Sequence, residues 1–596
     1  MARTSRRKFI AGSALLAGAA VVRPASTVAA TGDAGAAAAE APSASAITPA
    51  TVAEAEKLAE VRYTAAERSQ ASSSWDVNFG ATLKDRRAYH PAEAIVPACL
   101  WDPRIPGAPT GPSRTRTKFS RSLAPLPSSD TDIAYAPVTA LSEWLRTRKI
   151  SSSRLTELYL ERLHRFGPKL ECVITLTPEL AREQARRADA EIAQGKWRGP
   201  LHGIPWGVKD LLDTAGIRTT WGAEPFKDRV PTKDGTVVDR LHTAGAVLLA
   251  KLSLGALALN DIWFGGETKN PWLLAEGSSG SSAGSAAATA AGLVGFAIGS
   301  ETGGSIVSPS SRCGVTGLRP TFGRVPRTGA MTLCWSLDKL GAMARSVEDT
   351  LLVLAAISGP DGKDLGCVPS HLEFDAAQPV SKLRVGYVPS WLEKPANSFD
   401  KQSLPVDKSV LDAVKAAGMT PVPVEFPALP YAALNTVLFA EAAASFEEMT
   451  LSHQMDELKM QVFDAWPNLF RQARFLSAVD LVQADRLRRQ AAVAMNTLLT
   501  TVDVLLVPYL RDETLIGTNL TGHPSLTLRA GFIEIDRIRS DWLPPPGQQW
   551  PQLPGKHRVP QGVTLIGRLF DEGTLARVGM ALEQGLKVAG ERPPGF

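Results

Sequence analysis

The chain has 596 residues, of which 44% are hydrophobic and 21% are charged, and its mean hydropathy is −0.04. A packed core is therefore feasible, and the length suffices for several average domains or for one large α/β domain with additions. The net charge is +5, but residues 1–30 carry five basic residues and no acidic one, so the remaining chain is formally neutral. This balance argues against nucleic acid or an anionic surface as a partner.

Residues 1–30 have the pattern of an export signal. Two arginines, Arg6 and Arg7, precede the apolar stretch "FIAGSALLAGAAVV", which at 14 residues is too short to span a bilayer comfortably. Small residues in "TVAATG" offer a cleavage site near Ala29 or Ala30. The pattern resembles a bacterial twin-arginine signal, which directs folded proteins to export. We expect a periplasmic or extracellular protein with no stable membrane insertion once the signal is removed.

Residues 31–132 are predicted to form an N-terminal appendage followed by a linker, to which we assign no chemistry. Residues 31–49 are rich in Ala and Ser, "ATVAEAEKLAEVRYTAAERSQA" is predicted to be a helix, and residues 102–130 form a Pro/Ser/Arg-rich connector. The chain has five cysteines, which would allow one disulfide but not a scaffold built on disulfides. It contains no CxxC or HExxH motif and no cluster of His and Asp, so we expect neither a metal nor a cofactor.

Residues 133–596 alternate predicted helices and strands. The stretch "SSSRLTELYLERLHRF" has helical spacing of its apolar residues, and "GAVLLAKL" and "VDVLLVPYL" are typical of buried strands. A helix, "VDKSVLDAVKAAG", lies between the predicted strands "LRVGYVPS" and "TPVPVEF". Residues 540–562 are predicted to be an irregular loop, and residues 571–587 a final helix. This order indicates an α/β fold: one large α/β/α domain around a mixed, mostly parallel sheet.

Three segments carry residues suited to nucleophilic catalysis. Two runs of small residues, "EGSSGSSAGSAAATAAG" and "GSETGGSIVSPSSRCG", flank one predicted helix and offer hydroxyls at both of its ends. Upstream, "GPLHGIPWGVKDLLDTAGIRTTWG" places Lys209 in an apolar segment, although a lysine considered alone is more often a surface residue. A serine needs a proton acceptor to become a good nucleophile. A lysine can accept that proton if burial lowers its pKa, and the neighbouring Ile204, Trp206 and Val208 favour such burial.

These segments resemble those of the amidase signature family. They occur in the family's order and spacing together with "NPW", "GVTGLRPTFGRV" and "SLDKLGAMARSVED", strongly over residues 140–359 and more weakly to about residue 532. The resemblance implies an α/β/α amidase domain at residues 133–596 and a catalytic triad without histidine. Ser305 matches the nucleophile, Ser281 the bridging serine on a cis peptide bond, and Lys209 the base.

Other residues of the serine-rich runs are predicted to support this triad. Gly303 and Gly304 allow a tight turn, so that the N–H groups from Thr302 to Ser305 can point at one oxyanion hole. The supporting residues are Ser282, Ser300 and Glu301. A second register, which would place Ser279 in the bridging position, is disfavoured by the alanine run after Ser285.

The chain departs from the family pattern near the nucleophile. Glu301 stands where an aspartate is usual, and Val307 stands where an arginine is usual. We interpret these two changes as the loss of an ion pair, with Arg312 as the candidate substitute. Ala283 replaces a glycine and Arg319 replaces a lysine, and none of the changes removes a catalytic group.

The resemblance implies that the protein hydrolyses a small or medium carboxylic amide to an acid and ammonia or an amine. An amidotransferase subunit that passes ammonia to a tRNA-bound partner is an alternative, against which the export signal argues. A non-catalytic binding protein on the same fold is another. The stretch "GSSAG" also fits the G-x-S-x-G motif of α/β-hydrolases, which would need a preceding strand and one of four histidines: His371, His453, His523 or His557. The oligomeric state is not predicted.

Overall fold

The computed structural model describes residues 47–75, 79–80, 99–393, 398–508, 511–544 and 548–596. The predicted export signal lies outside these residues. The chain divides into two compact units, Met1–Ala88 and Tyr89–Phe596. The first unit contains helices α1 (Pro49–Ala59) and α2 (Ala65–Trp75), where the sequence predicted a single helix. The helix is broken because Glu60 adopts a left-handed conformation that ends α1, and Thr64 and Glu67 then cap the start of α2 through reciprocal hydrogen bonds.

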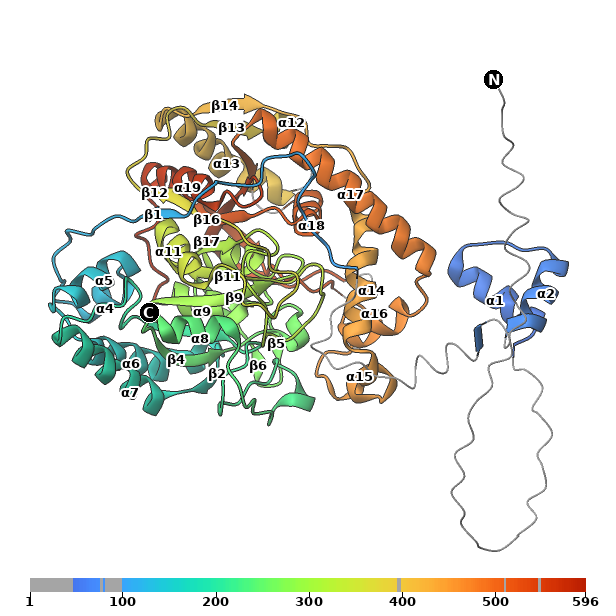
Figure 1. Cartoon of the computed structure of the whole chain (residues 1–596), viewed down its shortest axis with the longest axis horizontal. Helices are drawn as coiled ribbons and strands as arrows, with labels where there is room; N and C mark the ends of the chain where they lie inside the picture. The colour runs from blue at the N-terminus through green and yellow to red at the C-terminus, as the bar shows by residue number, and fades with distance from the viewer. Residues whose placement is uncertain (1–46, 76–78, 81–98, 394–397, 509–510, 545–547) are drawn as a thin grey trace, which may run out of the picture. The chain divides into compact units, whose positions relative to one another are not determined.

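The second unit is built on a sheet of eleven strands (Figure 1). Their order across the sheet is β14, β13, β15, β17, β16, β10, β11, β9, β3, β4, β2. In chain order, these strands are β2 (Val173–Leu176), β3 (Pro205–Lys209), β4 (Val247–Leu252), β9 (Phe296–Glu301), β10 (Thr316–Arg319), β11 (Lys339–Ala344), β13 (Arg384–Tyr387), β14 (Thr420–Pro423), β15 (Val504–Pro508), β16 (Ser525–Arg537) and β17 (Gln552–Gly567). Four of the ten neighbouring pairs are parallel and six are antiparallel, so the sheet is mixed as expected, but parallel pairs are not in the majority.

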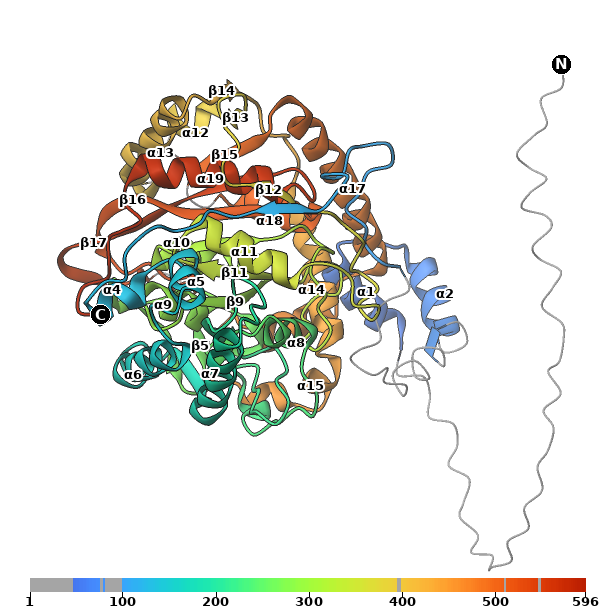
Figure 2. The ribbon, with the colours of Figure 1, turned by 60° about the vertical axis from the view of Figure 1, so that its left-hand side comes forward.

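Helices cover both faces of this sheet, as Figures 1 and 2 show. The longer helices are α5 (Val138–Arg146), α6 (Ser152–Leu170), α7 (Pro178–Ala193), α8 (Thr236–Thr243), α9 (Ala283–Ala290), α11 (Val347–Ile357), α13 (Ser398–Ala416), α14 (Asn435–Ser445), α16 (Trp466–Ala473), α17 (Ala478–Thr501), α18 (Asp512–Thr521) and α19 (Glu572–Leu586). Shorter ones are α4 (Asp130–Tyr135), α10 (Val307–Cys313), α12 (Pro389–Glu393) and α15 (Glu447–Leu451). The α/β/α architecture predicted from the sequence is confirmed.

The two faces can be told apart on strand β11, where successive side chains alternate. Met343 packs into a cluster with Ala286 of α9 and Cys313 of α10. Its neighbours Ala342 and Ala344 belong to the main core on the opposite face, with α11 and α19. Both faces of the central strands are therefore buried, which explains why these strands are rich in apolar residues.

The prediction of an irregular loop over residues 540–562 is wrong for the second half of this segment. Residues from Gln552 onward form β17, which pairs antiparallel with β16 over most of its length. Prolines suggested a loop, but a strand tolerates proline at its ends and near bulges, and Pro560 lies close to the register shift between Arg529 and Gly531. The partner strand supplies the hydrogen bonds, so the local sequence was a poor guide here.

The connector at residues 102–130 packs on the larger unit. Its short strand β1 (Arg116–Lys118) pairs in parallel with β12 (Glu373–Asp375). Trp101, the residue directly before the connector, also contacts this unit: the guanidinium of Arg488 lies 3.9 Å from the centre of the Trp101 ring. The compact unit therefore begins earlier in the chain than the expected boundary after residue 132.

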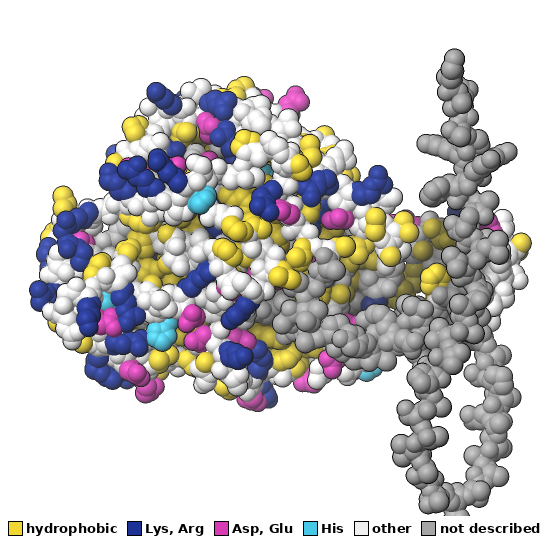
Figure 3. Space-filling model, in the orientation of Figure 1, with side chains coloured by type: hydrophobic (Ala, Val, Ile, Leu, Met, Phe, Trp, Pro, Cys, Tyr) yellow, Lys and Arg dark blue, Asp and Glu magenta, His cyan; other side chains and the backbone are white. Residues whose placement is uncertain are grey.

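Basic and acidic side chains are interspersed on the surface, and the cysteines are unpaired. Lys and Arg side chains have Asp and Glu side chains among them on the face of the molecule in Figure 3. All five cysteines are free thiols. Among the described residues, every helix is too short or too polar to cross a membrane.

Candidate active site

Lys209 stands at the carboxyl end of strand β3 and is completely buried. Its Nζ lies 2.8 Å from Ser281 Oγ, 2.8 Å from Ser300 Oγ and 3.1 Å from Ser282 Oγ. Burial lowers the pKa of Lys209 well below its usual value, although the carboxylates of Asp338 and Glu301 act in the opposite direction. The side chain is thus suited to act as a neutral amine that accepts a proton.

Ser281 belongs to a loop, Ser278–Ser282, between strand β8 (Leu273–Gly277) and helix α9. The Gly280–Ser281 peptide bond is cis, as the family resemblance implies. Ser281 and Ser282 are fully buried. The lysine contacts Ser281 rather than Ser279, whose hydroxyl donates to Asp541 instead. This geometry favours the Ser281 register of the two overlapping serine motifs.

Two hydrogen-bond links join the serine loop to the segment that carries Ser305. The hydroxyl of Ser282 donates to the Ser300 carbonyl oxygen and accepts from the Ser300 N–H, both at 3.1 Å. The N–H of Ser282 donates to the Ser305 carbonyl oxygen at 3.1 Å. Because β3 and β9 are parallel neighbours, their carboxyl ends bring Lys209 and Ser300 to the same edge of the sheet.

Ser305 lies in the turn between β9 and α10 and is half-buried. Its hydroxyl makes no hydrogen bond with the described residues, Ser281 included. The N–H groups of Gly303, Gly304 and Ser305 likewise have no partner among them, whereas Gly304 adopts a φ of 133° that favours glycine. An unpaired hydroxyl beside unpaired N–H donors can accommodate both an attack on a carbonyl carbon and the oxyanion that forms.

Glu301 connects the turn of Ser305 to strand β10 and helix α18 through hydrogen bonds of its buried carboxylate. One of its carboxylate oxygens accepts the N–H groups of Ile306 and Val307, at 2.7 and 2.8 Å. The other accepts from Arg319 at 2.8 Å and from Asn519 at 2.9 Å. Burial acts to raise the pKa of Glu301, but the Arg319 guanidinium outweighs this effect and holds that pKa below its usual value.

The prediction that Arg312 substitutes for the usual ion-pair partner of Glu301 is wrong. Arg319, on β10, is the partner of Glu301, and both side chains are almost fully buried. Arg312 pairs with Asp541 instead, at 2.9 Å. Glu301 therefore has an ion-pair partner on the neighbouring strand β10, and that partner is Arg319.

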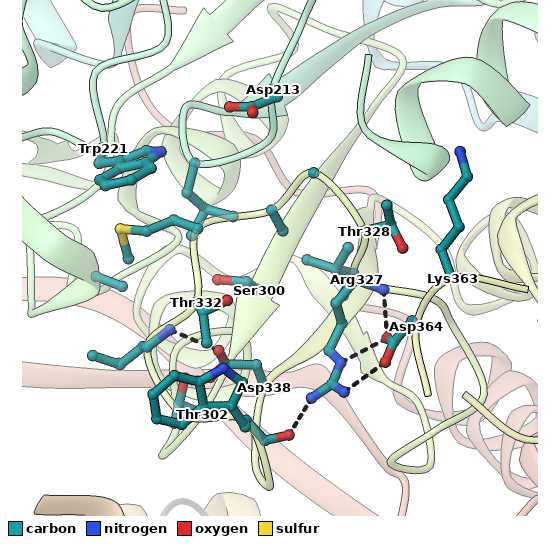
Figure 4. A pocket seen from close by; sticks show the side chains of 18 of the residues that line it. Asp213, Trp221, Ser300, Thr302, Arg327, Thr328, Thr332, Asp338, Lys363 and Asp364 are labelled. Carbon is teal, nitrogen blue, oxygen red and sulfur yellow. Dashed lines mark hydrogen bonds and ion pairs between the residues drawn. The ribbon is translucent and has the colours of Figure 1, made fainter. Parts of the chain in front are cut away.

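A cavity of about 480 Å³ opens beside Ser300 and Thr302 (Figure 4). Four of its six charged lining residues pair with one another: Asp213 with Arg229 at 2.7 Å, and Arg327 with Asp364 at 2.8 Å. The other two are Asp338 and Lys363, which is exposed at the edge of the lining. Asp338 accepts hydrogen bonds from the Thr302 hydroxyl at 2.6 Å and from the N–H groups of Leu333 and Cys334. The apolar part of the lining is Leu211, Trp221, Ala258, Ala330, Met331, Leu333, Trp335 and Leu340.

The sequence profile of the Amidase family matches residues 154–576, most of the larger unit. The chain belongs to the Amidase family. It is 31% identical over 514 residues to a glutamyl-tRNA(Gln) amidotransferase subunit of Carboxydothermus hydrogenoformans, covering 78% of this chain and 99% of that protein. The solved structure of the peptide amidase from Stenotrophomonas maltophilia matches with a TM-score of 0.63 and 29% identity, covering 77% of this chain and 98% of that one. The crystal structure of PAM12A matches with a TM-score of 0.64 and 30% identity, over 77% of this chain and 98% of that one.

The geometry does not support an α/β-hydrolase elbow at Ser282 in this Amidase family member. Within the described part of the chain, strand β8, before the serine loop, pairs with the short strand β7 (Lys269–Asn270) in a separate two-stranded sheet and not with the central sheet. The Ser282 hydroxyl is buried against Lys209 and Ser300. Among the candidate histidines, His523 is buried and hydrogen-bonded to Thr521.

Three residues near the site were not singled out from the sequence. Asp338 contacts Thr302, Asn519 contacts Glu301, and Asp541 contacts Ser279. Asn519 lies within "TNLTGHPSLTL", a segment that already resembled the family. Asp338 follows "SL" in a motif of the same family. The sequence around Asp338 and around Asp541 contains no local pattern that predicts a contact with a distant loop.

Proposed function

We propose that the protein is an amidase that hydrolyses a carboxylic amide to the acid and ammonia or an amine through an acyl-Ser305 intermediate. The observation that carries this proposal is the buried Lys209, 2.8 Å from Ser281 Oγ and linked through the serine loop to the turn of Ser305. Membership of the Amidase family supports an amide carbon–nitrogen bond as the target.

The residues divide the chemistry as follows. Ser305 Oγ attacks the carbonyl carbon while its proton passes to Ser281 Oγ, and a Ser281 proton passes to the neutral Lys209 amine. The carbonyl oxygen becomes an oxyanion that accepts hydrogen bonds from the N–H groups of the Gly303–Ser305 turn. When the C–N bond breaks, the leaving nitrogen takes the proton from Lys209 by way of Ser281. Water then attacks the acyl group in the same manner, releasing the acid and restoring Ser305.

The cavity beside Ser300 and Thr302 favours an uncharged, mainly apolar acyl group. A volume of about 480 Å³ lies in the range of sites that hold medium-sized ligands and far exceeds the need of the smallest amides. The pairs Asp213–Arg229 and Arg327–Asp364 neutralise each other, as Figure 4 shows for the second pair. A zwitterionic amino-acid amide such as glutamine would lose its hydration with little charge compensation in return.

A relative at 31% identity bears the name of an amidotransferase component, so ammonia delivery to a partner remains the second candidate function. The two functions differ in the source of the ammonia. A hydrolase of the proposed kind acts by itself on an uncharged amide. An amidotransferase-like protein would release ammonia from a donor such as glutamine and pass it to a partner protein.

Ammonia release from a panel of amides tests the proposal. Phenylacetamide and N-acetylphenylalaninamide are expected to show kcat/KM about tenfold or more above that of acetamide, because a buried phenyl ring contributes about 1.5–3 kcal/mol. Glutamine is expected to be a poor substrate. The Ser305→Ala chain serves as the blank. Hydrolysis of esters alone, or preference for glutamine, would contradict the proposal, and no hydrolysis of any substrate would favour a binding protein.

We also propose that the protein is exported through the twin-arginine pathway, on the strength of Arg6 and Arg7 before an apolar stretch. Residues 1–35 fused to a folded reporter are expected to carry it out of the cytoplasm. The double substitution Arg6→Lys/Arg7→Lys is expected to retain it inside, because such signals are read by a receptor and charge alone does not suffice. Lys8→Arg is the matched control. Unchanged export of the double variant, measured by fractionation, would contradict the proposal.

A further inference from the structure

The catalytic serine loop is held by a segment far away in the sequence, the connection between strands β16 and β17. Asp541, between strands β16 and β17, accepts a hydrogen bond from the Ser279 hydroxyl through Oδ2. The same oxygen lies 3.4 Å from the N–H of Gly280, the residue directly before Ser281. Asp541 is therefore hydrogen-bonded to both residues that precede the bridging serine.

The loop at this point has little room and an unusual backbone. Ser279 adopts a φ of 63°, in the left-handed region that residues other than glycine rarely occupy. Its N–H donates to Asp261 at 2.9 Å, so two carboxylates hold this one serine. A Cβ at Gly280 would lie 1.7 Å from the carbonyl oxygen of Asn260. The loop is thus in close contact with both the Asn260 backbone and the Asp541 carboxylate.

Asp541 is itself fixed in place. Its Oδ1 accepts a hydrogen bond from Arg312 at 2.9 Å, and Arg312 also donates to the Arg539 carbonyl oxygen at 2.8 Å. Arg539 pairs with Glu276 on strand β8, directly before the serine loop. Because Arg312 lies on α10, the helix after Ser305, the carboxylate of Asp541 joins the serine loop to the helix of the nucleophile.

We propose that Asp541 is a positioning residue for catalysis: it holds Ser279 and Gly280 so that Ser281 stays between Lys209 and Ser305. This inference rests on the proposed function of Ser305, Ser281 and Lys209. It assigns a role to the 538–544 segment and explains why Ser279, which carries an overlapping serine motif, is buried here without touching the lysine. Loss of the carboxylate displaces Ser281 and slows proton transfer without altering the cavity that binds the acyl group.

An alkyl fluorophosphonate tests this role independently of the natural substrate. In its reaction an Oγ–P bond forms at Ser305, the P–F bond breaks, fluoride leaves, and the serine proton passes to Ser281 and Lys209. We would measure kinact and KI in the full chain by mass spectrometry of the Ser305 peptide. Asp541→Asn and Ser279→Ala are each expected to lower kinact about tenfold or more, because small displacements of catalytic groups are costly. KI is expected to stay within about twofold, since binding of the probe is unaffected.

Three further variants distinguish positioning from general damage. The double variant Asp541→Asn/Ser279→Ala is expected to be no slower than the worse single variant, because both changes break one contact. Asp541→Glu, which keeps an acceptor carboxylate, is expected to recover part of the rate. Asp536→Asn removes an exposed carboxylate on β16 and is expected to match the unchanged chain. Ser279→Ala keeps the Asp541–Arg312 ion pair and answers the question alone if the aspartate variant does not fold.

The outcomes separate the proposed function of the site from the role of Asp541. If Ser305 of the unchanged chain is not labelled, the proposed function fails and this inference fails with it. If Ser305 is labelled but kinact is the same in Asp541→Asn and Ser279→Ala, the inference alone is overturned. Fully additive losses in the double variant would also overturn it, because the two groups would then act separately.

Discussion

Lys209→Ala and Ser305→Ala are each expected to lower kcat on an amide by on the order of 10⁴, and the double variant is expected to be no worse than either one. The physical reason is that the two groups act on one proton through Ser281, so removing either one stops the proton transfer and removing the second adds no further loss. The Lys209 amine sits 2.8 Å from Ser281 Oγ in a fully buried position, where water cannot easily take its place. Steady-state ammonia release measures the effect.

The pH profile shows whether the loss is that of a base. Activity of the unchanged chain is expected to rise with pH as Lys209 loses its proton, with a midpoint below the usual lysine pKa because burial lowers it. The residual activity of Lys209→Ala is expected to lack this rise. Lys149→Ala and Ser409→Ala, at exposed positions, are the matched controls and are expected to retain full activity. An active Lys209→Ala enzyme would contradict the triad.

Glu301→Ala is expected to lower the free energy of unfolding by about 3–5 kcal/mol, because it leaves the buried Arg319 without its carboxylate partner. It also releases the N–H groups of Ile306 and Val307 behind the nucleophile, so activity is expected to fall as well. Since the pKa of Glu301 is held below its usual value, this contribution is present at neutral pH and is lost as the pH falls through that lowered pKa. Urea unfolding at neutral and acidic pH measures both effects.

Glu157→Ala is the control for this experiment. Glu157 pairs with Arg182 on the surface, where both side chains are nearly half exposed. Its removal is expected to cost less than about 1 kcal/mol. A similar small loss for Glu301→Ala would mean that Arg319 finds another partner and that the buried pair does not stabilise the nucleophile turn.

Several elements could be predicted from the sequence because their signal is local. The helix around residues 151–166, the strand at 245–252 and the final helix at 571–587 appear as α6, β4 and α19 with bounds close to those expected. Their apolar residues follow helical spacing or form short β-branched runs, and burial of one face or of the whole strand imposes that pattern. The candidate site residues could be named for a different reason: several motifs of one family occur in the family's order, and the structure brings Lys209, Ser281, Ser300 and the turn of Ser305 together.

The sequence alone thus determined the fold class, the family resemblance and the identity of the candidate triad. The tertiary structure decided which charged groups meet: Glu301 with Arg319 rather than Arg312, and Asp541 with Ser279 across more than half of the larger unit's sequence. It also decided that residues 552–562 form a strand, because their hydrogen bonds come from β16 and not from their own neighbours. Such pairings depend on the distance between side chains after the sheet has formed. A residue's own sequence neighbourhood carries no information about that distance.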